Sequence, residues 1–172
     1  MHNSGWDLNL PISWCYIALH QAERLRNTFA EFRAVMFPNN DADLSDLQEA
    51  RGRRFVFWGD AHFMILATRH LIQALEAVQA LQAVPMGPKL PKALGRQTNL
   101  LRNQLEHWED APNKGAWKDL VDRHGAYASP YQVMFDGVNS DLKIGADKIS
   151  VNELEQRLTA VLDELLRLES EF

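Results

Sequence analysis

The sequence has a single cysteine, Cys15, among its 172 residues, so the chain can form no internal disulfide. Such usage is typical of a reducing compartment, and the apolar neighbours of Cys15 favour a small buried residue over a reactive nucleophile. The first 14 residues, MHNSGWDLNLPISW, also lack the basic region and apolar run of a signal peptide. We therefore expect a cytoplasmic protein.

Long uninterrupted apolar runs are absent as well. The most hydrophobic segment, FVFWGDAHFMILATRHLIQAL, contains Asp60, His62, Arg69 and His70, which a membrane span of this length rarely tolerates. The sequence therefore predicts no membrane partner. The composition, 46% hydrophobic and 24% charged, is that of an ordinary globular chain, and the length predicts one helical domain over residues 1–172.

The spacings that hold metals or activate nucleophiles are missing too. No histidine has an acidic residue three positions before it, and the chain contains no Cys/His cluster, His-Glu-x-x-His, glycine-rich phosphate loop or Gly-x-Ser-x-Gly. We expect no metal and no cofactor. His62 lies in an apolar helix, where a hydrogen-bonded core histidine is favoured over a ligand, and we interpret Arg69-His70 as structural.

The spacing of apolar residues predicts a mainly α fold, a bundle of four or five helices with a small β-hairpin before the last helix. Ser13 is the expected N-cap of a first helix, which ends before FPNND, residues 37–41. A second, central helix is expected from about residue 43 towards Val84, with a kink at Gly52 or Gly59.

A proline-rich connector, residues 84–94, leads to a third helix from about Lys92 to Asp110, and a short helix is expected over 117–124. Alternating apolar residues from 131 to 144, around a turn at Asp136-Gly137, predict the hairpin. Ser150 and Glu153 have capping-box spacing before the last helix. The apolar stripe of that helix consists of Leu154, Leu158, Val161, Leu165 and Leu168.

Acidic residues are missing between Glu76 and Glu106, a window that holds Lys89, Lys92, Arg96 and Arg102. The net charge of −5 argues against a general nucleic-acid binder, but this window would let an anion approach the region around residue 102. A second basic cluster, RGRR, lies at residues 51–54. We interpret it as a solvent-exposed face, as most runs of charge are.

Residues 99–110, NLLRNQLEHWED, predict an amphipathic helix. At about 100° per residue, Leu101, Leu105 and Trp108 share the buried edge, which Leu94 and Thr98 extend. The opposite arc holds, in angular order, Arg102, Glu106, Asn103 and His107. Arg102 and His107 are about 140° apart, too far to act together within one helix. Two copies that meet across a two-fold axis would each supply one arginine and one histidine to a shared cleft.

The segment RNQLEH, with Arg102, Asn103 and His107, resembles the Arg-polar-x-x-x-His signature of the HEPN superfamily, the higher eukaryotes and prokaryotes nucleotide-binding domains. Its members are small α-helical bundles, many of them metal-independent ribonucleases of toxin–antitoxin, phage-defence and RNA-processing systems. The resemblance rests on this motif and the helical layout, and the hairpin would be an insertion into the minimal family fold. It implies a homodimer that takes RNA or a nucleotide, not DNA, with an antitoxin protein as a further partner.

Cleavage of RNA without a metal needs a base for the 2′-hydroxyl proton, an acid for the leaving 5′-oxygen and positive charge at the phosphorane. His107 suits proton transfer near neutrality, and Arg102 offers a planar fork of donors. Asn103 and Glu106 would support them. The leading hypothesis is a HEPN-type endoribonuclease. The alternatives are a non-catalytic module that binds a nucleotide, RNA or a protein, and a helical scaffold in which Arg102 and Glu106 form an exposed ion pair.

Overall fold

The computed structural model describes residues 8–36, 44–82, 92–106, 133–137, 140–144 and 147–171. Within these ranges lie four helices: α1 (Asn9–Met36), α2 (Leu44–Gln82), α3 (Lys92–Glu106) and α5 (Val151–Ser170). Three strands precede α5: β1 (Val133–Asp136), β2 (Asp141–Ile144) and β3 (Asp147–Ser150). The helices alone hold more than half of the 172 residues, which confirms the mainly α fold with a small β element before the last helix.

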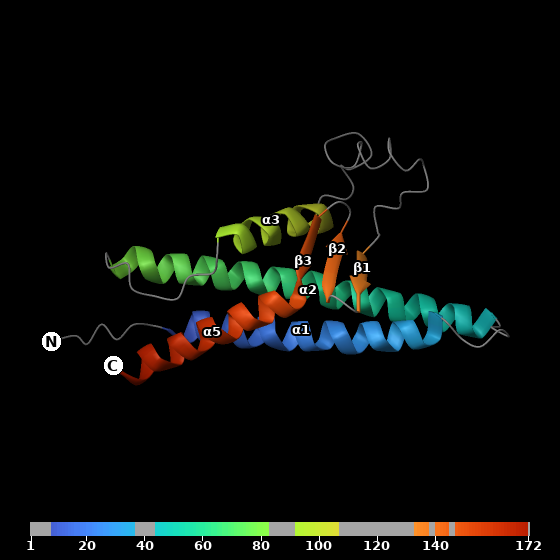
Figure 1. Ribbon diagram of the computed structural model, residues 1–172, viewed down its shortest axis with the longest axis horizontal. Coiled ribbons are helices and arrows are strands. Elements are labelled where there is room, and N and C mark those ends of the chain that lie inside the picture. Colours follow the sequence, from blue (N-terminus) through green and yellow to red (C-terminus); the bar gives the residue numbers. More distant parts are fainter. Residues whose placement is uncertain are drawn as a thin grey trace.

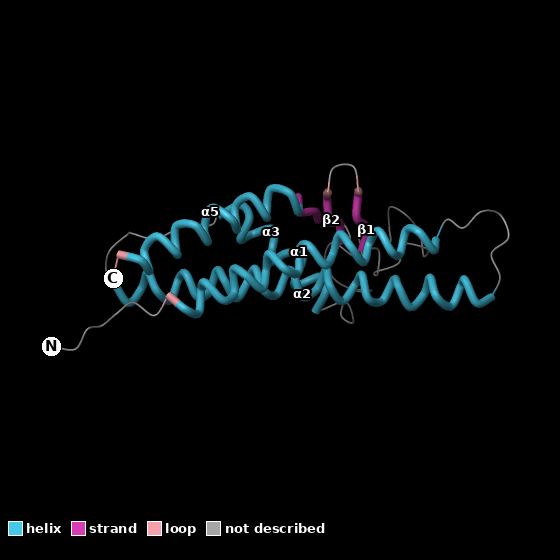
Figure 2. Tube along the Cα trace, turned by 90° about the horizontal axis from the view of Figure 1, so that it is seen from below, coloured by secondary structure: helices cyan, strands magenta, loops and turns pink. Residues whose placement is uncertain are grey.

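The helices are arranged around one long antiparallel pair, α1 and α2 (Figure 1). Helix α3 runs back along α2, and α5 runs back along α1 (Figure 1). Seen from below, α5 and the strands follow one another along one side of the pair (Figure 2). No helix in the part of the chain that the structure describes has a stretch long and apolar enough to cross a membrane.

A single apolar cluster joins these elements. Cys15, Ala18 and Leu25 of α1 are fully buried, and the thiol of Cys15 donates to the carbonyl oxygen of Leu158 in α5 at 3.1 Å. Burial, the largest effect, raises the pKa of this thiol from its ordinary value of 9.0 to about 12. The expectation of a buried cysteine is therefore confirmed, and its low reactivity stays a prediction.

Three phenylalanine rings extend the core towards the sheet. Phe29 of α1 contacts Phe57 of α2, with ring centroids 5.4 Å apart, and meets Phe135 of β1 edge to face at 4.9 Å. Such tilted contacts between rings are the favourable geometry for aromatic pairs. The far half of α1 is therefore held between α2 and the sheet.

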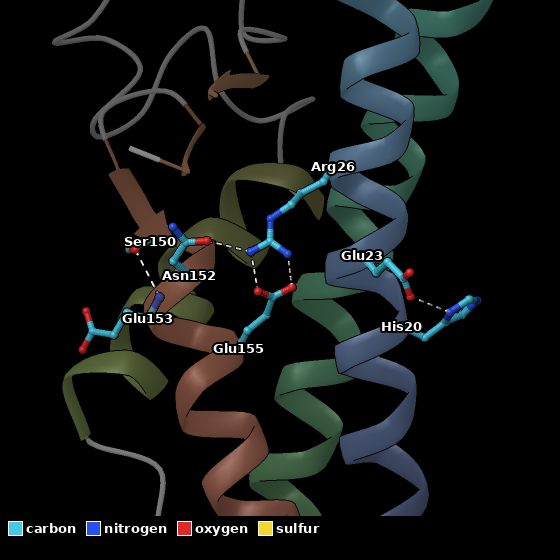
Figure 3. A network of polar contacts seen from close by, with 7 residues as sticks. All are labelled: His20, Glu23, Arg26, Ser150, Asn152, Glu153 and Glu155. Carbon is cyan, nitrogen blue, oxygen red and sulfur yellow. Dashed lines mark hydrogen bonds and ion pairs between the residues drawn. The ribbon is translucent and has the colours of Figure 1, made fainter. Parts of the chain in front are cut away.

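Two arginines of α1 tie it to its neighbours. Arg24 Nε donates to Oδ1 of Asp60 in α2 at 3.1 Å, and Arg24 Nη2 forms an ion pair with the same oxygen at 3.0 Å. The Asp60 side chain is 4% exposed and that of Arg24 is 49% exposed, so the negative charge is the buried partner. Arg26 donates to both carboxylate oxygens of Glu155 in α5 and to Asn152 (Figure 3).

Helix α1 begins at Asn9, five residues before the start at Trp14 that an N-cap at Ser13 implies, so the assignment of Ser13 as its N-cap is wrong. The amide of Ile12 donates to the carbonyl of Leu8 at 3.0 Å, which closes the first turn. Pro11 lies inside this first turn, where backbone N–H groups have no acceptor within the helix. The N–H that proline lacks therefore costs the helix no hydrogen bond. Helix α2 continues through both Gly52 and Gly59.

The predicted hairpin is the first part of a three-stranded antiparallel sheet. Strands β1 and β2 pair from Val133↔Ile144 to Asp136↔Asp141, so the turn falls after Asp136, as expected. The third strand, β3, is an addition that the sequence did not predict. Ser140, in the turn, has a φ of 54°, a left-handed conformation that is uncommon outside glycine.

The start of α5 confirms Ser150 as the N-cap, which is one of the two bonds of the predicted capping box. The Ser150 hydroxyl accepts the amide of Glu153 at 3.2 Å (Figure 3). The amide of Val151 donates to the carbonyl of Ser140 at 2.8 Å, which joins the helix to the turn before β2. Each residue of the predicted apolar stripe is buried: Leu154, Leu158, Val161, Leu165 and Leu168. The short helix expected over 117–124 lies outside the described residues.

Candidate functional site on the outer face of helix α3

The buried edge of α3 lies where the helical wheel puts it. Leu94, Thr98 and Leu101 are buried, with at most 4% of each residue exposed. The Thr98 hydroxyl donates to the carbonyl of Leu94 at 2.8 Å, so this polar side chain is satisfied within the core. The side chain of Leu105, and Trp108, lie outside the described part of the chain. The orientation of α3 up to Leu101 is confirmed.

Arg102 and Asn103 lie together on the solvent side of this edge. Arg102 is half-buried and Asn103 is exposed. Arg102 Nη2 donates to Asn103 Oδ1 at 2.7 Å. This contact orients the planar guanidinium along the helix surface, and Asn103 keeps its amide nitrogen as a further donor. Two of the four predicted site residues are therefore brought into contact.

Helix α2 contributes an arginine, Arg69, that was expected to be structural. Arg69 donates to Asn99, one turn before Asn103 on the same face of α3. Its neighbour His70 stacks on Trp14 of α1, with ring centroids 4.5 Å apart. Arg69 therefore lies beside the α3 face that carries Asn99 and Asn103, whereas His70 belongs to the α1–α2 contact. A contact across 30 residues leaves no local signal in the sequence.

His62 lies two turns before Arg69 on the same face of α2. It is half-buried, and its ring lies beside that of Phe63 with centroids 6.3 Å apart. Its Nε2 atom is buried, and no residue within the described ranges hydrogen-bonds to it. A hydrogen-bonded core histidine was expected here; His62 is instead only half-buried, and its Nε2 has no hydrogen-bond partner within the described ranges.

The remaining motif residues fall at the limit of the described helix. Glu106 is the last residue of α3, and the position of its side chain lies outside the described structure. His107 is likewise outside the described ranges. The roles of Glu106 and His107 therefore stay predictions, as does their approach to the motif residues of a second copy.

Two arginines of the second basic cluster, RGRR, contact other residues of the same chain. Arg53 forms ion pairs with Glu31 of α1 and Glu49 of α2. The guanidinium of Arg54 lies over the Trp58 ring, 4.4 Å from its centroid, in a cation–π contact. These contacts agree with the structural explanation of the RGRR segment. Across the described residues, no three His, Cys, Asp or Glu side chains come close enough to hold a metal ion.

Comparison with known proteins does not assign this chain to a family. No protein-family model matches the sequence, and no curated protein or solved structure matches it significantly.

Proposed function

We propose that this chain is a metal-independent endoribonuclease of the HEPN type, toxin- or defence-like, that acts in the cytoplasm as a homodimer. The observation that supports the proposal is the pairing of Arg102 with Asn103 on the solvent side of α3. These two adjacent residues begin the motif, and together they offer a charged fork and an amide to a phosphate. Arg69, bonded to Asn99 one turn earlier, adds positive charge along the same face.

The proposed chemistry assigns one role to each motif residue. His107 transfers protons, Arg102 stabilises the charge that develops on the phosphorane, and Asn103 and Glu106 orient the two. The 2′-hydroxyl attacks the adjacent phosphorus and its proton is removed, while the leaving 5′-oxygen gains a proton. The products carry 2′,3′-cyclic phosphate and 5′-hydroxyl ends. DNA lacks the attacking hydroxyl and stays intact.

The proposed catalytic site requires motif residues from two copies of the chain. Arg102 and His107 are about 140° apart on one helix, so a single helix does not converge them on one phosphate. A two-fold axis beside α3 would place the arginine of one copy near the histidine of the other. Light scattering at micromolar concentration is expected to give the mass of a dimer. A monomer would count against catalysis and leave the fold unaffected.

The decisive experiment follows the cleavage of labelled RNA in EDTA, because the proposed reaction uses no metal ion. His107→Ala is expected to slow cleavage roughly 10²–10⁴-fold, since it removes the proton-transfer group. Arg102→Ala is expected to be similarly damaging. Arg102→Lys is expected to recover only part of the rate, because an ammonium lacks the bidentate fork.

Two matched controls separate the site from general changes in charge. His20→Ala removes an exposed histidine of α1, and Arg157→Ala removes an exposed arginine of α5. Both are expected to cleave like wild type. If wild-type protein leaves varied RNAs intact, or if His107→Ala cleaves as fast as wild type, catalysis is rejected. RNA binding without cleavage, lost in Arg102→Ala, would then identify a non-catalytic module.

A further inference from the structure

An open cleft lies between α1 and the strand turn, on a different part of the molecule from the α3 face. Its volume is about 600 Å³, within the range of small-molecule sites. Helix α1 supplies one wall with residues spaced three and four apart, which places them on one face of the helix. Strand β1 and the turn after it supply the other wall. The principal lining residues are Arg26, Phe29 and Arg33 from α1, Phe135 from β1, and Gly137 and Ser140 from the turn.

The two arginines of the cleft differ in what already binds them. Arg26 donates to Glu155 and Asn152 of α5, so its charge is matched within the fold (Figure 3). Arg33 is exposed and forms no hydrogen bond or ion pair with any residue in the described ranges. Arg33 is therefore the cation that the cleft offers to a ligand.

The guanidinium of Arg33 lies beside an aromatic ring. A Cβ atom built on Gly137 would be 3.9 Å from Arg33 Nη1 and 3.4 Å from Cε1 of Phe29. Both groups therefore border the same small space above Gly137. Phe29 contacts the rings of Phe57 and Phe135, so it is already ordered before any ligand binds.

The strand side of the cleft is also fixed in place. The carbonyl of Ser140 accepts the amide of Val151, which ties the turn to the start of α5. The carboxylates of the flanking strands are partly matched by Lys148, which donates to Asp141 at 2.8 Å. The hydrogen bond and charge of Asp141, with the charge of Asp136, raise the pKa of Lys148. The negative charge of Asp141, next to Ser140 in the chain, is therefore matched within the sheet.

We propose that this cleft binds a small organic anion, whose planar ring packs on Phe29 and whose phosphate or carboxylate binds Arg33. A guanidinium presents two parallel donors to either group, and a ring ordered by its neighbours gives an apolar surface at low entropic cost. The site is separate from the α3 motif, so it does not depend on ribonuclease activity.

Isothermal titration calorimetry of the full chain tests the proposal with three probes. Adenosine 5′-monophosphate presents a ring with a phosphate, 2-naphthoate presents a ring with a carboxylate, and adenosine presents a ring without charge. At least one of the two anions is expected to bind with a Kd of about 1 mM or tighter. Which anion binds more tightly identifies the charged group. Adenosine is expected to bind roughly tenfold more weakly or not at all.

Four variants locate the site. Arg33→Gln is expected to weaken anion binding at least about tenfold, because it removes a charge-assisted bond. Ala30→Leu keeps the charge and fills the cleft from an exposed position of α1, so it is also expected to weaken binding. Arg157→Gln, the matched loss of charge on α5, is expected to bind like wild type. Arg102→Ala tests whether the anion binds at the α3 motif instead.

The proposal is overturned if neither anion binds at millimolar concentration. It is also overturned if Arg33→Gln and Ala30→Leu bind as tightly as wild type, because the anion then occupies another place. Loss of binding in Arg102→Ala alone would move the site to the α3 face. None of these outcomes depends on whether the protein cleaves RNA.

Discussion

Replacing Arg24 with methionine is expected to destabilise the fold by about 3 kcal/mol. The reason is the asymmetry of the ion pair: the Asp60 side chain is 4% exposed, and the hydrogen bond and the ion pair from Arg24 both reach a single oxygen, Oδ1. The other oxygen, Oδ2, is buried and has no hydrogen-bond partner among the residues that the structure describes. Without Arg24 a carboxylate stays between α1 and α2 with its charge unmatched. Removal of one partner of a buried pair costs roughly 3–5 kcal/mol, and the half-exposed arginine favours the lower end.

Urea unfolding followed by circular dichroism measures this loss directly. A loss of about 3 kcal/mol lowers the melting temperature by roughly 6–12 °C for a domain of this size. The double variant Arg24→Met, Asp60→Leu is expected to unfold within about 1 kcal/mol of wild type, because both charges are replaced by apolar groups. Arg157→Met, at an exposed position, is the matched control and is expected to change stability by less than about 0.5 kcal/mol.

Two results would refute the reasoning about this pair. One is an Arg24→Met variant as stable as wild type, since the buried charge would then not need its partner. The other is a double variant no more stable than Arg24→Met, since the loss would then come from packing of the arginine stem and not from an unmatched carboxylate.

Three further predictions concern thiol chemistry and stability. Cys15 is expected to react with a thiol reagent at pH 8 only after denaturation, because burial raises its pKa to about 12, and reaction at the free-thiol rate in native protein would contradict this. The folded pKa lies above the ordinary value of 9.0, so the stability linked to this thiol is full below about pH 9 and is lost as the pH rises towards 12. Ser150→Ala removes the N-cap of α5 and is expected to cost about 1 kcal/mol in urea unfolding, with Ser150→Thr close to wild type.

The sequence predicts best those features that depend on neighbours within one or two turns. The cap at Ser150 and the buried stripe of α5 follow from residues three or four positions apart, and both are confirmed. Strand β3 was missed because its four residues, DKIS, contain one apolar side chain, Ile149, too few to show alternation. The start of α1 was misplaced because the sequence does not distinguish a proline in the first turn of a helix from a proline that precedes the helix.

The candidate site also has features that the sequence predicts and features that it does not. The arc that holds Arg102 and Asn103 follows from helical periodicity, but their contact with each other does not. The approach of Arg69 to Asn99 depends on how α2 and α3 pack, which the spacing within either helix does not encode. The cleft beside Arg33 is likewise formed by segments about a hundred residues apart in the sequence. No sequence motif therefore predicts it.

The pairing of α1 with α5 has a consequence for the order in which the protein folds. Helices α1 and α2 are neighbours in sequence and can pair as soon as both have left the ribosome. The contact between Cys15 and Leu158, by contrast, joins positions 143 residues apart. Contacts between such distant positions form late, because a long loop must close first. One apolar side of α1 therefore stays uncovered during synthesis until α5 has been made, and this interval is when a nascent chain is most exposed to aggregation or capture by a chaperone.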